Sequence, residues 1–276
     1  MVLETRKSKA LKYFFLVLFS IMVIFPVYFA LLSSLKDGME IFTKPFSFPE
    51  KIAQDNYPRA IKIGNIGVCF LNSMFVTGAT MLVCALFGTM ASYVLARCKF
   101  KSQAFWYTLF VAGLMIPIQS VLIPLSYTFG LLHIHDSYTM LILLFTAFQL
   151  PMTIFITTNF LKGIPYELEE AAIIDGCSRT RTFFQIIAPL AIPGITTASV
   201  FNFLGAWNNL IFPLIFVSKK SMQVIAIGLQ AFFAQRVSDY GGVMAAIIIS
   251  IAPPILAYIF LQEKVEQGMV AGAVKG

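Results

Sequence analysis

The chain has 276 residues, of which 58% are hydrophobic and 12% are charged, and its formal net charge is +7. Soluble globular proteins carry about 25% charged residues, so this composition argues against a soluble protein and favours one that lies in a lipid bilayer. In such a chain a basic excess usually sets the orientation in the membrane. It therefore does not indicate nucleic-acid binding.

Six apolar stretches are each long enough to cross about 30 Å of hydrocarbon. They cover residues 12–35, 68–96, 104–127, 138–161, 189–217 and 240–261. The first follows a basic segment, but it is too long for the apolar part of a signal peptide and no small-residue cleavage site follows it. The prolines inside the stretches are compatible with spanning helices whose neighbours satisfy the freed backbone groups. We therefore predict an all-α integral membrane protein with six transmembrane helices, organised as one domain over residues 1–276.

The basic residues predict the orientation of these helices. Four of them precede the first stretch and three follow the second, with no acidic residue in the second group: Arg6, Lys7, Lys9, Lys12, Arg97, Lys99 and Lys101. Since positive loops stay in the cytoplasm, both chain ends and the loop 163–188 are expected there. The connections 36–67, 133–137 and 218–239 are expected on the opposite side.

The six stretches lack the groups that an independent pump would need. All thirteen acidic residues lie outside them, whereas proton-coupled transporters keep carboxylates or histidines in the membrane. Sodium coupling through backbone carbonyls would require corresponding broken helices, and the sequence shows no such pair. None of the 17 glycines is followed by lysine, so the chain has no Walker A loop. If transport runs against a gradient, a partner must supply the energy.

One charged segment interrupts this apolar chain. Its charged residues are Glu167, Glu169, Glu170, Asp175, Arg179 and Arg181. Pro165 suits a first helical position, and the three glutamates suit the positive end of a helix dipole. Gly176 fits the left-handed cap of this helix, and Ser178 can cap the next one. The residues predict a helix, a glycine turn and a second helix, although an ordinary amphipathic loop at the lipid headgroups remains an alternative.

The same segment resembles the EAA loop of ABC importer permeases. The family pattern is Glu-Ala-Ala, three residues, Gly, nine residues, Ile, one residue and Leu-Pro. Here Glu-Ala-Ala at 170–172 is followed by Gly176, and nine further residues lead to Ile186. The single departure is Ala188, which stands in the usual Leu position before Pro189.

The resemblance implies a type I ABC importer transmembrane fold in which the loop 163–188 is a coupling helix seated on a cytoplasmic ATPase. The residues implied in this contact are Glu170, Ala171, Ala172, Asp175, Gly176 and Pro189. Shorter motifs extend the resemblance over nearly the whole chain: DNY at 55–57, NS at 72–73, YVLAR at 93–97, WNN at 207–209 and GMVAGAVKG at 268–276. This combination resembles the smaller permease subunit of maltose-type carbohydrate importers.

In that family the C-terminal tail reaches toward the ATPase pair, which makes Gly272 and Lys275 expected contacts. Taken alone, the tail would be read as a disordered terminus. Asn209 departs from relatives that often carry an acid after Trp-Asn. The departure keeps the spanning stretches free of carboxylates.

Neutral polar residues recur on one helical face in two of the stretches. The sets are Ser199, Asn202, Ala206 and Asn209 in the fifth stretch and Thr146, Gln149, Thr153 and Thr157 in the fourth. Amides and hydroxyls exchange hydrogen bonds with sugar hydroxyls, and a ring such as Trp207 or Phe203 can cover an apolar sugar face. The expected pathway residues are therefore Asn72, Gln119, Gln149, Ser199, Asn202, Trp207 and Asn209. The alternative is that each of them is an interhelical contact.

No metal site is expected. His133 and His135 lie beside Asp136 without an evident fourth ligand, so a solvated hairpin, which touches the binding protein, is the preferred interpretation. The four cysteines, Cys69, Cys84, Cys98 and Cys177, contain no CxxC pair, and neither a disulfide framework nor zinc ligation is predicted.

We therefore predict the permease subunit of an ATP-driven, binding-protein-dependent importer of a disaccharide or oligosaccharide in the cytoplasmic membrane. The implied partners are a second homologous permease, two ATPase subunits, an extracytoplasmic solute-binding protein and the lipid bilayer. ATP and Mg²⁺ would bind to the ATPases, no cofactor to this chain, and the chain itself would not be an enzyme. One alternative cargo is a glycerol phosphate diester or another non-sugar solute. The alternative from another class is an ATP-independent channel or secondary transporter.

Overall fold

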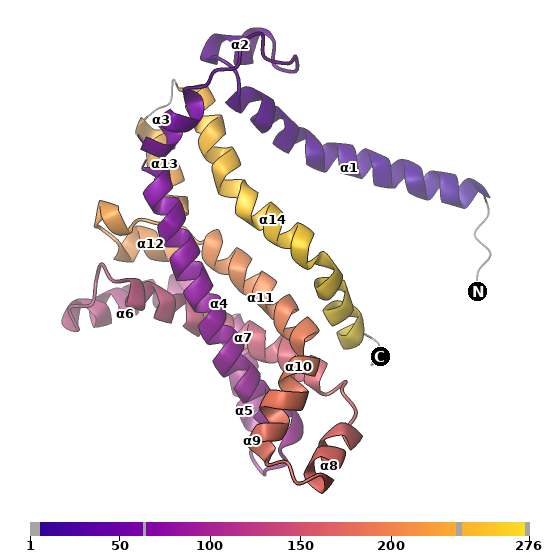
Figure 1. Cartoon of the computed structure of the whole chain (residues 1–276). Coiled ribbons are helices and arrows are strands. Elements are labelled where there is room, and N and C mark those ends of the chain that lie inside the picture. The colour runs from indigo at the N-terminus through magenta and orange to yellow at the C-terminus, as the bar shows by residue number, and fades with distance from the viewer. Residues whose placement is uncertain (1–5, 63–64, 236–238, 274–276) are drawn as a thin grey trace. The chain divides into compact units, whose positions relative to one another are not determined.

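The computed structural model describes residues 6–62, 65–235 and 239–273, and every regular element in these ranges is helical (Figure 1). Four helices are long and apolar enough to cross a membrane: α1 (Arg6–Ser34), α4 (Ile66–Arg97), α7 (Tyr138–Leu161) and α14 (Tyr240–Ala273). The bounds of α7 coincide with those of the predicted fourth stretch. No charged residue interrupts this helix, so composition alone predicts its ends.

Two helix pairs that are bent by more than 40° are further candidate spans. The first joins α5 (Gln103–Ala112) and the short 3₁₀ helix η1 (Gly113–Met115) to α6 (Ile118–Leu131) at an angle of 96°. The second joins Arg179–Leu190 to α11 (Ile192–Trp207) at 70°. The chain therefore has four candidate spans, or up to six if each bent pair is one span.

These bends are breaks that the predicted stretches do not show. Pro117 has an extended backbone with ψ of 132°, and Ile116 before it is also extended. Proline disfavours the helical conformation for the residue that precedes it, which accounts for the extended backbone of Ile116 at the first bend. The residues on both sides of each bend are apolar, so a hydropathy pattern runs through the bend without a signal.

The remaining helices are short, with bounds α2 (Gly38–Thr43), α3 (Asn56–Lys62), α8 (Glu167–Ile174), α9 (Arg179–Thr182), the π-helix η2 (Phe183–Ile187), α10 (Ala188–Leu190), α12 (Ile211–Phe216), η3 (Lys220–Met222) and α13 (Ile225–Gln235). The chain forms two compact units, residues 1–67 with 228–252 and residues 68–227 with 253–276. The helices α4 and α14 each contribute to both units.

Polar side chains that bond to backbone carbonyls stabilise the first unit. The Asn56 amide of α3 donates to the carbonyls of Ser34 and Lys36, both at 2.8 Å. The buried Lys36 amine donates to the carbonyl of Lys44 at 2.6 Å and to that of Pro45 at 3.1 Å. The Asn56 bonds satisfy carbonyls at the end of α1 and just after it, and the Lys36 bonds fix the segment that follows α2.

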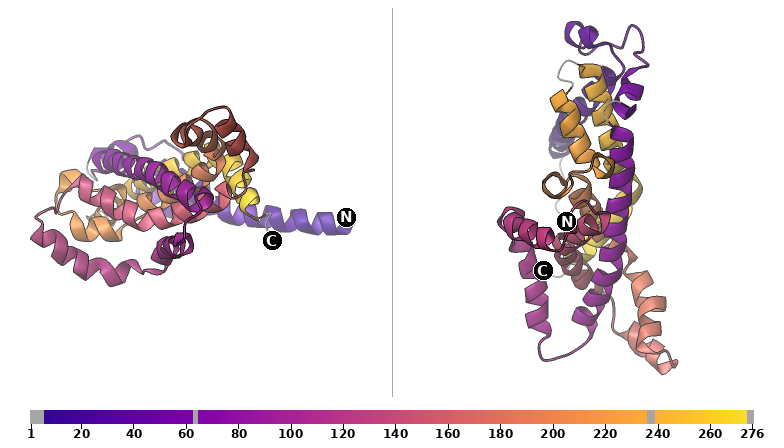
Figure 2. Two further views of the ribbon diagram at one scale, coloured as in Figure 1. Left: turned by 90° about the horizontal axis from the view of Figure 1, so that it is seen from below. Right: turned by 90° about the vertical axis from the view of Figure 1, so that its left-hand side faces the viewer.

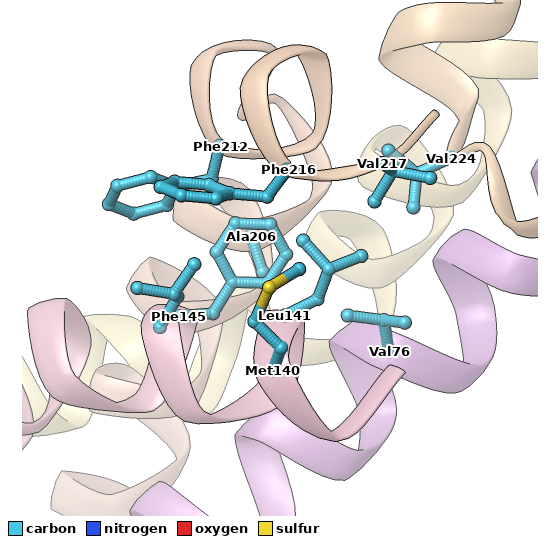
Figure 3. Close-up of a cluster of buried hydrophobic side chains, with 10 residues drawn as sticks. Val76, Met140, Leu141, Phe145, Ala206, Phe212, Phe216, Val217 and Val224 are labelled. Carbon is cyan, nitrogen blue, oxygen red and sulfur yellow. The ribbon is translucent and has the colours of Figure 1, made fainter. Parts of the chain in front are cut away.

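The second unit contains a core around α7 (Figure 3). Its buried members come from α4, α7, α11, α12 and the segment that follows α12: Val76, Met140, Leu141, Leu144, Phe145, Ala206, Phe212, Phe216, Val217 and Val224. The helices approach closely where glycine removes a side chain. A Cβ on Gly88 would lie 2.6 Å from the Thr153 methyl group, and one on Gly194 would lie 2.6 Å from the Phe160 ring. This core places the helix breaks of the unit against α7.

Candidate functional site

The loop between α7 and α11 folds into a short helical hairpin of α8 and α9 at one end of the second unit (Figures 1 and 2). Its first helix begins at Glu167, with three glutamates in the first turn as predicted. Pro165 is not the first helical residue, because Tyr166 takes the N-cap position and its carbonyl accepts from the amides of Glu169 and Glu170. Tertiary contacts of Tyr166 therefore decide where the helix starts.

The turn between the two helices has the predicted chemistry. Gly176 has a φ of +82°, the left-handed conformation that favours glycine. Its amide bonds to the carbonyl of Ile173 at 3.0 Å, and the next amide, of Cys177, bonds to the carbonyl of Ala172 at 2.9 Å. This pair of bonds is a Schellman motif. The Ser178 hydroxyl then accepts from the Arg181 amide at 3.3 Å and caps α9.

A buried arginine connects the hairpin to the ends of two long helices. The Arg97 side chain, the last of α4, is 1% exposed. It donates at 2.7 Å to the carbonyls of Leu161 and Ile164 and pairs at 3.0 Å with the carboxylate of Glu169. Its guanidinium lies 4.3 Å from the centre of the Tyr166 ring. We call these five residues the Arg97 joint.

Further contacts reinforce the Arg97 joint. The Tyr166 hydroxyl donates to the Ala96 carbonyl at 3.0 Å, and the Tyr93 hydroxyl donates to Glu169 at 3.3 Å. Ile187 and Ala191, which follow the hairpin, are buried against Ala96. Because a buried charge is stable only when it is paired, these contacts hold the ends of α4 and α7 and the start of α8 in one arrangement.

Sequence reasoning counted Arg97 only as an orientation charge and did not find this joint. A signal was present in the YVLAR motif, where Tyr93 and Arg97 lie one helical turn apart and therefore on one face. Both side chains reach the same carboxylate, that of Glu169. The sequence alone does not show which of the three glutamates of α8 would accept them.

The outer surface of the hairpin is apolar as well as acidic. Leu168, Ile173, Ile174 and Phe184 are exposed, and Ile174 is 85% exposed. Among the residues predicted to contact an ATPase, Ala172 is buried, whereas Glu170, Ala171, Asp175, Gly176 and Pro189 are exposed. An exposed apolar tip on a firmly connected hairpin is suited to bind another protein.

Three of the expected pathway residues make close contacts within the chain. The Asn72 amide donates to the carbonyls of Ser221 and Gln223 and accepts from the Tyr138 hydroxyl. The buried Asn202 amide donates to the Thr153 hydroxyl at 2.9 Å. The buried Trp207 ring stacks on Phe203 at 5.4 Å and meets Phe70 edge-on. These contacts tie helices together.

The structure brings two other candidates to one cavity. Gln149 of α7 and Asn209, between α11 and α12, both line it, and the Asn209 carbonyl oxygen also accepts from the Phe212 amide at 3.1 Å. Gln119 is exposed on α6, and Ser199 is half-buried on α11. Neither of these two lines the cavity. Gly272 belongs to α14, and Lys275 lies outside the described residues.

Comparisons with known proteins identify the family. Residues 87–271 match the model of the binding-protein-dependent transport system inner membrane component. The chain is 35% identical over 275 residues to the diacetylchitobiose uptake system permease protein NgcG of Streptomyces coelicolor, across 98% of this chain and 90% of that protein. It is 34% identical over 273 residues to the probable starch degradation products transport system permease protein AmyC of Thermoanaerobacterium thermosulfurigenes, across 98% and 99%.

A solved structure shows the same fold. A chain of a bacterial ABC transporter involved in the import of the acidic polysaccharide alginate matches with a TM-score of 0.79 and 18% identity, across 95% of this chain and 99% of that chain. The predicted all-α fold of an ABC importer permease is thus confirmed. Its apolar helices make the chain a multi-pass membrane protein. Because the family model covers more than half of the chain, the chain belongs to the inner membrane components of binding-protein-dependent transport systems.

Proposed function

We propose that this permease is the transmembrane subunit of an ATP-driven importer that carries a neutral disaccharide or oligosaccharide across the cell membrane. The relatives NgcG and AmyC are named for the uptake of diacetylchitobiose and of starch degradation products. The observation that carries the ATP-driven part is the α8–α9 hairpin, whose exposed apolar tip is firmly connected to the ends of α4 and α7 through the Arg97 joint.

This geometry supports a coupling role for the hairpin. A partner that binds at Ile173 and Ile174 pushes or pulls on a short helix whose opposite end is held by Glu169 and Tyr166. The movement then reaches α4 and α7, and small shifts at an interface become alternate packings of helices. The chain has no Walker A loop of its own. The partner at the tip is therefore one of two ATPase subunits, which bind ATP and Mg²⁺.

The remaining partners follow from the family and from charge. The family description includes a binding protein, which delivers the solute, and a second permease completes the pathway. The basic residues around the first two spans support a cytoplasmic location for the hairpin and both chain ends. The protein then lies in the cytoplasmic membrane. The end of α14 with Gly272, together with Lys275, contacts the ATPase pair.

The lack of charged residues in the predicted spanning stretches supports a neutral cargo. An anionic solute such as a glycerol phosphate diester would require a basic residue in its path. Apart from Lys12 at the start of the first one, the predicted stretches contain no lysine or arginine. A self-sufficient transporter would need embedded ionisable groups, and all thirteen acidic residues lie outside the stretches. Both observations favour a neutral carbohydrate moved by a partner's ATP hydrolysis.

ATP hydrolysis by the purified complex in lipid vesicles tests this function. The complex is mixed with its binding protein and a panel of neutral saccharides, acidic saccharides and glycerol phosphate diesters. We expect one class of neutral saccharide to stimulate hydrolysis and to accumulate in the vesicles. Gly176→Val should abolish both effects, because valine disfavours the left-handed turn. Solute conduction by the chain alone without ATP would contradict the proposal.

A further inference from the structure

A cavity of about 260 Å³ lies in the second unit, where two interruptions of the helices meet α7. Gly113 and Ile116 line it at the bend between α5 and α6. Gly205 and Asn209 line it at the end of α11, and Gln149 lines it from α7. We call it the Gln149 cavity. Irregular backbone at membrane depth is found where protein or a water-filled space surrounds it, and broken helices of transporters form ligand sites.

The polar groups of the Gln149 cavity include one without a partner. The Gln149 carbonyl oxygen is buried and has no hydrogen-bond partner among the described residues. Leaving such an acceptor unpaired is unfavourable. Gly205 stands beside it, since a Cβ there would lie 3.3 Å from the Gln149 amide carbon. The Asn209 side chain is held by the Phe212 amide at 3.1 Å, and its NH₂ group supplies donors.

The rest of the lining is apolar and aromatic. Phe148 and Phe212 lie with ring centres 5.1 Å apart and planes inclined at 56°, and Phe145 lies 6.0 Å from Phe212. No charged side chain is among the described residues that line the cavity. A few convergent polar groups in a mostly apolar hollow are typical of small-molecule sites. Aromatic faces suit the C–H face of a sugar ring, and the amides suit its hydroxyls.

The size of the cavity limits what it can hold. Typical small-molecule pockets have volumes of about 300–1,000 Å³, and a cavity of about 260 Å³ lies just below that range. A volume of this size suits a single sugar ring. The absence of charge in the lining means that an acidic ring would lose its hydration without gaining an ion pair, which is strongly unfavourable.

We propose that the Gln149 cavity is a saccharide subsite of this subunit: it binds one neutral sugar ring during transport through the Gln149 and Asn209 amides and excludes acidic rings. The proposal rests on the proposed function, because it assumes that the cargo is a carbohydrate. It goes further by assigning the subunit its own contact with the cargo and by naming the residues that select it.

Protection of a cysteine by saccharide tests the subsite directly. The four native cysteines are replaced by serine in the whole complex, and Leu114→Cys places a thiol in the wall of the cavity. Ile123→Cys is the matched control, because it is exposed on α6 and does not line the cavity. The probe is the neutral disaccharide that most stimulates ATP hydrolysis. We expect it to slow methanethiosulfonate labelling of Leu114→Cys at least threefold and to leave Ile123→Cys unchanged.

Gln149 variants complete the test. In the Leu114→Cys background, Gln149→Leu should abolish the protection and Gln149→Asn should retain part of it, while the labelling rate without saccharide stays that of Leu114→Cys alone. A disaccharide that contains glucuronic acid should give no protection.

Three results would overturn the subsite: protection that survives Gln149→Leu, equal protection of both cysteines, or a Leu114→Cys that is labelled in the lone chain and inaccessible in the complex. The last would mean that another subunit fills the cavity. In each of these cases the proposed function would still hold if the unaltered complex performed ATP-driven uptake of saccharide. Absence of such uptake would overturn both.

Discussion

The Arg97 joint and the Gln149 cavity lie in the same unit, and they use polar side chains in opposite ways. In the joint, a guanidinium that is 1% exposed meets two carbonyls, a carboxylate and an aromatic ring. In the cavity, a buried amide oxygen has no described partner and the lining carries no charge. The ion pair and the hydrogen bonds of the joint connect the ends of α4 and α7 to α8, whereas the Gln149 acceptor can gain a bond from a ligand. The joint is built to transmit movement and the cavity to receive cargo.

The largest effect should come from removing the charge of the Arg97 joint. Arg97→Met leaves Glu169 buried without its partner and frees the carbonyls of Leu161 and Ile164. Breaking a buried ion pair in this way costs about 3–5 kcal/mol. We expect a large fall in the Tm of the purified chain and loss of co-purifying ATPase. Lys99→Met removes an exposed charge two residues away and should change neither. Equal stability of both variants would contradict the role of the joint.

The turn at Gly176 should respond to backbone conformation alone. A Cβ at this position would meet no atom within 4 Å, so a substitution disturbs only the left-handed φ of +82°. This conformation costs about 1–2 kcal/mol for an ordinary L-residue, less for asparagine and more for a β-branched residue. Binding-protein-stimulated ATP hydrolysis should therefore fall in the order Gly, Asn, Ala, Val. A harmless Gly176→Val would mean that the shape of the turn does not matter for coupling.

A smaller change distinguishes the cavity from the joint. Gly205→Ala places a Cβ 3.3 Å from the Gln149 amide. The amide borders open space, so it can move by a few tenths of an ångström, and the free energy of unfolding should change by only about 0.5 kcal/mol. Saccharide protection of Leu114→Cys should nevertheless weaken, while stimulated ATP hydrolysis persists. Unchanged protection would show that the position of the amide is irrelevant to binding.

The smallest effect concerns Asp136, whose hydrogen bonds are exposed and not buried as in the joint. The backbone amides of Lys219, at 2.9 Å, and Ser218, at 2.6 Å, donate to its carboxylate and lower its pKa from the ordinary value of 3.8. A carboxylate whose pKa is lowered in the folded state stabilises the fold at pH values above its ordinary pKa. This stabilisation is lost as the pH falls below that value. Asp136→Asn keeps a residue that tolerates the φ of +56° and removes the charge.

The measurement for this prediction is the Tm of the wild-type chain and of Asp136→Asn as a function of pH. The difference should be small and constant from about pH 7 to pH 5 and should shrink below about pH 4, where the wild-type carboxylate takes up its proton. A difference that changes between pH 7 and pH 5 would point to another titrating group.

Local chemistry explains which features could be predicted from the sequence. The bounds of α7, the left-handed Gly176 and the Ser178 cap depend on residues a few positions apart. The bends at Pro117 and near Ala191 were missed because apolar residues continue through them. Pro117 was visible, but proline inside a spanning stretch is compatible with a continuous helix.

Features that depend on distant residues could not be predicted. Arg97 pairs with Glu169 across 72 positions, and the sequence contains two other glutamates in the same helical turn. The Gln149 cavity requires the two helix interruptions to meet at α7. Gln149 and Asn209 were found by helical periodicity, but so were Asn202 and Ser199, which do not line it. Periodicity identifies a helical face and does not show which residues of that face border a space.

Photo-cross-linking from the hairpin tip tests the central claim most directly. A benzophenone group is attached to Ile174→Cys in a complex free of other cysteines, with Met115→Cys as a control of nearly equal exposure, 85% against 84%. We predict that position 174 cross-links to an ATPase subunit, that ATP changes the yield, and that position 115 gives no such product. If position 174 cross-linked only to lipid or to its own chain while the complex still performed ATP-driven uptake, the hairpin would not be the coupling element.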